Sequence, residues 1–169
     1  DDALQQSAML DSIGRKFDAM AVLNLVSKRK TGFSWRDFTS CMEDLSLSRD
    51  VNGIYVKSQS EQDERKVLYH VSPTDSSGNI YQQSDGGSIH DIVLYMNVPA
   101  TTNPAQTFGM MLNDANQLQA WLEAKMVDHK GHSMTGKTLD AIHEQVSSIS
   151  RSMLEEGLRP GSPLTNKLF

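Results

Sequence analysis

Apolar residues near the end of the chain recur at alternating spacings of three and four. Side chains at that spacing lie on one narrow stripe of an α-helix, and such a stripe is typical of the seam along which one helix packs on another, as in a coiled coil. The pattern predicts a helix over residues 135–156, ending at Gly157, whose stripe is the first candidate for partner binding: Leu139, Ile142, Val146, Ile149 and Met153.

Three further segments have the apolar spacing of helices. The first covers residues 2–30, where a basic cluster would complement the negative end of the helix before Gly32. The second covers residues 34–44, with Ser34 as a side-chain cap. The third begins at Asn103-Pro104 and runs to a glycine stop at Gly131.

Between residues 46 and 98 the pattern changes to short β-rich runs separated by turn residues such as Asn52-Gly53. Strands this close in sequence can pair only antiparallel, because a parallel crossover needs a dozen or more residues. In the last run one face is fully apolar and needs a cover, for which helices are available. The expected runs are 54–57, 66–72, 80–83 and 89–98.

Together these patterns predict an α+β fold. Two N-terminal helices are followed by an antiparallel β-meander of four or five strands and two long C-terminal helices that pack with the first helix. We expect a single domain over residues 1–157, helical at 1–45, β-rich at 46–98 and helical at 103–157, and an extended tail at 158–169.

The composition lies in the ordinary globular range and excludes few classes of function. The 169 residues carry a net charge of -5 and 38% hydrophobic residues, which gives no general attraction for nucleic acid or an anionic membrane. No apolar run approaches the roughly 18 residues of a membrane span. One cysteine, Cys41, cannot form an internal disulfide, and we expect it to be a buried, inert thiol. The chain begins with Asp1-Asp2, which leaves open a preceding leader or longer N-terminal region; the cytoplasm is the default expectation and export stays open.

Residues 131–138, GHSMTGKT, match the phosphate-loop pattern G-x-x-x-x-G-K-[ST] letter for letter. Their context does not fit, because the preceding residues 124–130 are typical of a helix end and no room remains for a second strand with a Mg²⁺-binding aspartate. We interpret the segment as a helix-to-helix connection. A weaker hypothesis is that Gly136, Lys137 and Thr138, at the start of the last helix, hold an anion.

Two other groups of residues could carry chemistry. Lys28, Arg29 and Lys30 form the single local patch that could meet nucleic acid, although a helix end explains the cluster equally well. The histidines around residues 129–143 lack the spacing of a zinc site, so no metal or cofactor is expected.

The leading hypothesis is a non-enzymatic interaction or assembly protein that self-associates or binds a partner's helices through its helical seams. The layout is loosely similar to subunits of bacterial secretion filaments, which makes a structural or secretion-apparatus component one form of this hypothesis. Two alternatives remain open: a small enzyme with a site between sheet and helices, and a nucleotide or nucleic-acid binder that uses the 131–138 loop or the basic run.

Overall fold

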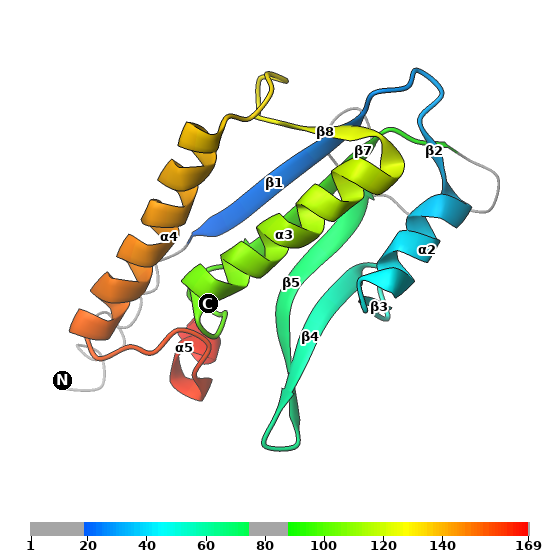
Figure 1. The fold of residues 1–169 in the computed structure, drawn as a ribbon. Coiled ribbons are helices and arrows are strands. Elements are labelled where there is room, and N and C mark those ends of the chain that lie inside the picture. Colours follow the sequence, from blue (N-terminus) through cyan, green and yellow to red (C-terminus); the bar gives the residue numbers. More distant parts are fainter. Residues whose placement is uncertain (1–18, 75–87, 169) are drawn as a thin grey trace.

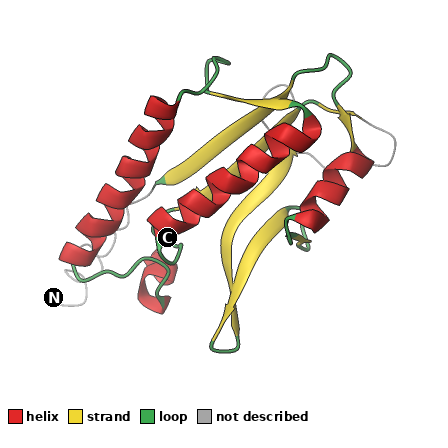
Figure 2. Cartoon of the chain, viewed as in Figure 1, coloured by secondary structure: helices red, strands yellow, loops and turns green. Residues whose placement is uncertain are grey.

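The core of the molecule is a six-stranded antiparallel sheet in the order β3-β4-β5-β7-β1-β8. The computed structural model describes residues 19–74 and 88–168. A separate two-stranded sheet joins β2 and β6. Figures 1 and 2 show how the long central strands lie side by side. The strands are β1 (Met20–Ser27), β2 (Phe33–Ser34), β3 (Ser48–Arg49), β4 (Tyr55–Glu61), β5 (Glu64–Thr74), β6 (Ser88–Ile89), β7 (Asp91–Asn97) and β8 (Ala124–Val127).

The three longer helices of the described residues lie on one face of this sheet (Figure 1). The longest helical segments, α3 and α4, pack against each other, and α3 also contacts the strands beneath it. The other face of the sheet is left without a helix in the part of the chain that the structure describes. The helices are α2 (Trp35–Asp44), α3 (Pro104–Leu122), α4 (Gly136–Glu155) and α5 (Pro163–Leu168).

Alternation along the central strands separates the two faces. In β1, Leu23 and Leu25 are completely buried toward the helices, whereas Met20 and Val22 on the opposite face are exposed. The same two-residue period appears in β7, because successive side chains of a strand point to opposite sides. The covered face is completed by four buried residues of α3: Phe108, Met111, Ala115 and Leu118.

A buried polar network joins the helices to the sheet. The Tyr69 hydroxyl on β5 donates a hydrogen bond to the Asp114 carboxylate on α3. The Lys57 ammonium on β4 lies 3.5 Å from the same carboxylate and donates to the carbonyl of Leu45, just after α2. Burial raises the pKa of Asp114 above its usual range, and the nearby Lys57 opposes that shift. Four elements are therefore tied together at one point beneath the apolar core.

The predicted fold class is wrong in its arrangement of elements. Residues 20–27, expected in the first long helix, form the central strand β1, paired with β7 on one side and β8 on the other. The rest of that expected helix, residues 2–18, lies outside the described residues, as does the expected strand at 80–83. The sheet therefore organises the molecule, and the structure has no pair of N-terminal helices packed on two C-terminal ones in its described part.

The expected third helix is also too long. It ends at Leu122, because Glu123 adopts a left-handed conformation (φ 53°) and the chain turns back as the edge strand β8. Residues 124–127 pair with β1 instead of extending the helix. The segment expected as an extended tail contains α5, and Leu158 ahead of it is buried.

Two helices lie where the sequence predicts them. In α2, Ser34 accepts a hydrogen bond from the amide of Asp37 (3.1 Å), and in α4, Thr135 accepts one from the amide of Thr138 (3.2 Å). Both contacts satisfy amides that the first turn of a helix leaves free. These helices cover a sheet, so the helical bundle and coiled coil expected from their apolar stripes are not supported. None of the helices in residues 19–74 and 88–168 is long and apolar enough to cross a membrane.

Candidate functional site

The face of the sheet that carries no helix exposes an unusual number of apolar side chains. Of the seven large hydrophobic residues that are most exposed in the described residues, three lie on this face: Met20 (50% exposed), Val22 (39%) and Val67 (44%). We call this surface the open face; it is formed by the outward side chains of β1, β4, β5, β7 and β8. Apolar surface that gathers on one face is typical of an interaction site, whereas single exposed hydrophobic residues are ordinary.

Strand register places these side chains in rows across the sheet. Val56, His70, Tyr95 and Val22 lie opposite one another on β4, β5, β7 and β1. Met20 lies opposite Asn97 in the next row. A register shift between Lys57 and Ser58 brings Val67 opposite Ser58 and so onto the same face. The exposed residues thus surround the middle of one continuous surface.

An aromatic pair lies at the centre of the open face. The rings of His70 and Tyr95 stack with centroids 4.9 Å apart and an interplanar angle of 7°. Burial lowers the pKa of His70, with a weaker opposing effect from Asp50, and burial also raises the pKa of Tyr95. Both rings are therefore held in their neutral forms near neutral pH, which keeps the centre of this face uncharged.

Two buried polar atoms on the open face lack a hydrogen-bond partner among the described residues. His70 Nδ1 and Asn97 Oδ1 are the buried side-chain atoms that lack a hydrogen-bond partner in the part of the chain described here. Buried polar atoms are paired in the great majority of cases, so two exceptions on one surface are informative. Apolar side chains on this face stand among polar ones, and the charged Asp91 and Lys125 lie opposite Val26 toward one end of β1. A mixed surface of this kind is suited to holding a polypeptide.

The apolar stripe predicted from α4 faces mainly inward. Val146 and Met153 are buried, while Leu139, Ile142 and Ile149 are partly buried against the chain's own core. The stripe therefore packs within this molecule, and its binding of a partner stays a prediction.

The residues predicted to hold an anion lie at the exposed start of α4. Gly136, Lys137 and Thr138 follow a loop that comes after the edge strand β8, whose neighbour β1 is antiparallel. The amide of Thr138 is already used by the Thr135 cap. Anion binding there stays a prediction, and the phosphate-loop context of a buried parallel strand is absent in the described residues.

The basic run lies in the exposed turn after β1. Lys28 and Lys30 are exposed, and Arg29 forms a two-pronged ion pair with Glu123, in which Arg29 Nε donates to Glu123 Oε2 at 2.8 Å. This pair raises the pKa of Arg29 and lowers that of Glu123. The run is therefore partly engaged in joining the turn to the end of α3, and nucleic-acid binding there stays a prediction.

Two other candidates are described by their surroundings. Burial raises the pKa of the Cys41 thiol to about 11, so the thiol remains protonated at neutral pH. The described residues contain no group of three or more histidine, cysteine or acidic side chains that could hold a metal ion.

Sequence reasoning missed the open face because it assigned β1 to a helix. One signal was present in the β7 run, where Val93 and Tyr95 alternate with the buried residues. A strand whose outward positions are also apolar or aromatic is unusual for a sheet with one face in water.

Comparison with known proteins relates this chain to a described family. Residues 19–145 match the family described as ZipA, C-terminal FtsZ-binding domain. Over 131 residues the chain is 24% identical to the cell division protein ZipA of Marinobacter nauticus, a match that covers 77% of this chain and 39% of that protein. The chain thus spans about two fifths of the length of this relative.

These findings support a protein-interaction role in cell division. They give no support to the resemblance to secretion-filament subunits, which depended on an N-terminal helix where the structure has strand β1 at Met20–Ser27. Because the family match extends over about three quarters of its residues, the chain belongs to the family of ZipA C-terminal FtsZ-binding domains.

Proposed function

We propose that this chain binds FtsZ and that the open face of its sheet is the contact surface. The observation that carries the proposal is the exposure of Met20, Val22 and Val67 on one surface that no described element covers. The name of the matching family supplies the partner. Burying such side chains against a partner is the main favourable contribution expected of these positions.

The centre of the open face supports the same proposal. His70 and Tyr95 form a flat stacked platform, and aromatic side chains of this kind are enriched among the residues that contribute most to binding.

The proposal is tested by measuring the dissociation constant of purified FtsZ for the wild-type chain and for Val22→Asp. A carboxylate at this position would lie beneath the partner without a counter-charge, so we expect at least roughly tenfold weaker binding. Val22 is exposed, which means that the variant should fold, and circular dichroism and thermal unfolding check this.

Leu154→Asp is the matched control, because Leu154 is also an exposed aliphatic residue and lies on α4, away from the open face. It should bind FtsZ as the wild type does. The proposal fails if wild-type binding is absent, if Val22→Asp binds normally, or if Leu154→Asp loses as much affinity as Val22→Asp.

Self-association or partner binding through the α4 stripe is a separate and finer hypothesis. Ile142→Asp tests it by light scattering of the wild type and the variant: a partner role predicts loss of association in a chain that remains folded. Because Ile142 also packs against the core, unfolding of the variant would mean that the stripe serves only the chain's own fold.

A further inference from the structure

Strand β5 is longer than its neighbour β7 and so has a free edge. Residues 70–74 of β5 pair with β7, whereas residues 64–67 pair only with β4. Within residues 19–74 and 88–168, no other strand and no other backbone hydrogen bond meets the second edge of residues 64–67. An unpaired strand edge presents a row of amide and carbonyl groups that can template another strand.

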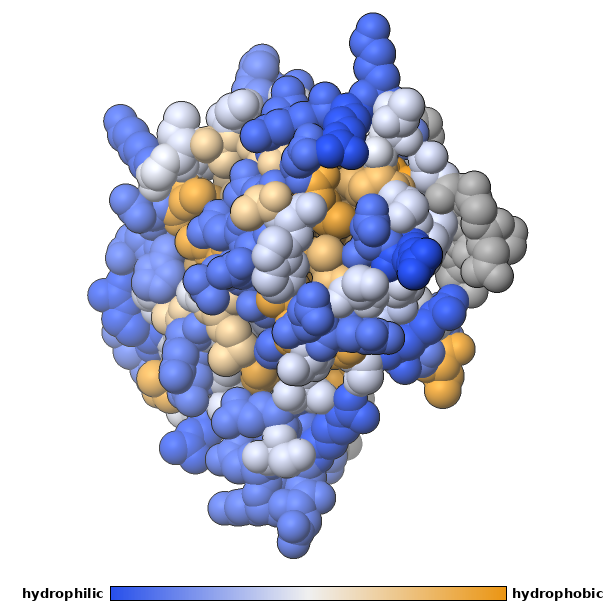
Figure 3. All heavy atoms as spheres, turned by 45° about the vertical axis from the view of Figure 1, so that its right-hand side comes forward, coloured by the Kyte–Doolittle hydropathy of each residue, from blue (hydrophilic) through white to orange (hydrophobic). Residues whose placement is uncertain are grey.

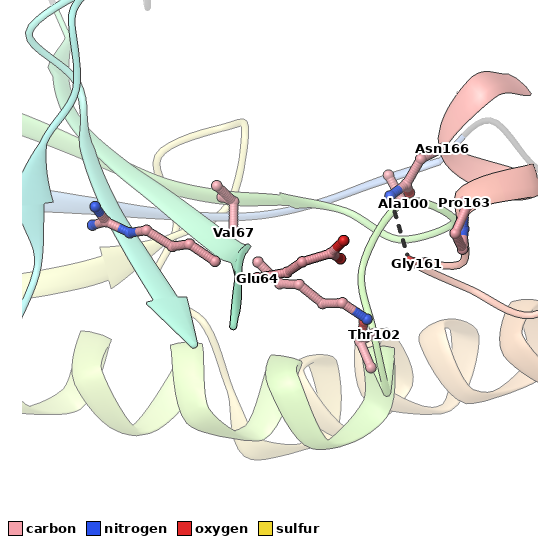
Figure 4. Close-up of a pocket in the computed structure, with 9 residues that line it drawn as sticks. Glu64, Val67, Ala100, Thr102, Gly161, Pro163 and Asn166 are labelled. Atoms are coloured by element: carbon pink, nitrogen blue, oxygen red, sulfur yellow. Dashed lines mark hydrogen bonds between the residues drawn. The ribbon is translucent and has the colours of Figure 1, made fainter. Parts of the chain in front are cut away.

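An open cavity of about 430 Å³ lies along this free edge. Its volume far exceeds the roughly 10–15 Å³ that one ordered water needs. Figure 4 shows the strand residues Glu64 and Val67 on one side and the opposing wall on the other. That wall is built by the loop before α3 and the segment that contains α5: Ala100, Thr102, Gly161, Pro163 and Asn166.

Both walls of the cavity are held in place. The Gly161 amide donates a hydrogen bond to the carbonyl of Pro99 (2.9 Å), which joins the α5 segment to the loop before α3. On the strand side, Arg65 Nε donates to Ser58 Oγ (2.7 Å), and the same guanidinium reaches Ser48 on β3. The gap therefore lies between two elements that hydrogen bonds already hold in place. Binding there would cost little conformational entropy of the protein.

The lining favours a polypeptide backbone over a strongly charged ligand. The free edge carries both signs of charge, and Lys66 Nζ already lies 3.4 Å from Glu61 Oε2. Neighbouring strands lie about 4.8 Å apart and rise about 3.3 Å per residue, so the four-residue edge matches an extended segment of similar length. Strand addition of this kind obtains its affinity from main-chain hydrogen bonds.

Val67 connects this cavity with the open face. Its side chain is exposed on the open face and also lines the cavity, so a chain that crosses the open face could continue past β5 into the gap. We infer that an extended, polar segment of the same protein partner enters this cavity and pairs with residues 64–67 as an added strand. The inference rests on the proposed function, in which that partner is FtsZ.

Filling the cavity tests the inference. Ala100→Trp places a bulky side chain in the wall opposite β5, and Ala141→Trp places the same side chain at an exposed position of α4, away from the cavity. Ala100→Trp should raise the dissociation constant for FtsZ roughly fivefold or more, as expected for losing a few backbone hydrogen bonds. Ala141→Trp should leave the dissociation constant unchanged.

Amide hydrogen exchange of the wild-type chain provides a measurement without any substitution. On binding FtsZ, exchange at residues 64–67 should slow at least tenfold, while the turn at residues 51–53 should be unaffected. Normal affinity of Ala100→Trp together with unchanged exchange at 64–67 would overturn the added strand but leave the open face as the contact. Undiminished binding by Val22→Asp would instead contradict the proposed function itself.

Discussion

The two faces of the sheet share the same strands and differ in what lies over them. Leu23 and Val22 are neighbours on β1, yet Leu23 is buried beneath α3 and Val22 is exposed on the open face. Apolar side chains on the covered face contribute to the free energy of folding, since they are already removed from water. Apolar side chains on the open face remain in contact with water, so the free energy of burying them is still available for association with a partner. One strand thus serves stability on one side and recognition on the other.

The largest expected effect comes from truncating these two neighbours. Leu23→Ala should lower the free energy of unfolding by about 2–5 kcal/mol, the range for a buried leucine. Val22→Ala should change it by about 0.5 kcal/mol or less, as for other exposed sites. Urea unfolding of both variants measures the difference. Similar losses would mean that the open face is buried in the free molecule.

A second prediction concerns the polar network beneath the covered face. Asp114→Ala leaves the Tyr69 hydroxyl and the mostly buried Lys57 ammonium without their shared acceptor, so it should cost about 1–3 kcal/mol of unfolding free energy. Asp140→Ala, on the exposed side of α4, is the control and should be nearly neutral. Equal stability of the two variants in urea would show that the network contributes nothing to the covered face.

The smallest expected effect is a pH dependence from the open face. Because burial lowers the pKa of His70, the unfolded chain binds a proton more readily than the folded one between that lowered pKa and the ordinary value of about 6.5. Stability should therefore rise with pH across this window and fall as acid protonates His70. In His70→Gln the slope between pH 5 and 7 should be shallower; an identical slope would show that His70 does not contribute.

Local patterns predicted the parts of the fold that depend on local contacts. The caps of α2 and α4 could be recognised because Ser34 and Thr135 act on amides three residues away. The antiparallel sheet could be expected from closely spaced β-rich runs. These features need no knowledge of distant parts of the chain.

The errors arose where two periods fit the same residues. In β1 the apolar positions 20, 21, 23 and 25 were assigned to a helical spacing, whereas the structure adopts a two-residue alternation that buries 21, 23 and 25 and exposes 20. Pairing with β7 and β8, which both come much later in the sequence than β1, decides between them, and local patterns do not show that pairing. At Glu123 the helix ends with a left-handed residue that is not glycine, so the usual stop signal was missing. Because β1 forms part of the open face, assigning its residues to a helix also prevented recognition of that face.

Position 161 accepts a single kind of residue for two independent reasons. Gly161 has φ +74°, and a Cβ added there would lie 2.5 Å from the backbone nitrogen of Thr102. Even Gly161→Ala would force the two chain segments apart, so the distance between the segment that contains α5 and the loop before α3 depends on one absent methyl group. The residues found at this position in related chains would show whether selection maintains that spacing.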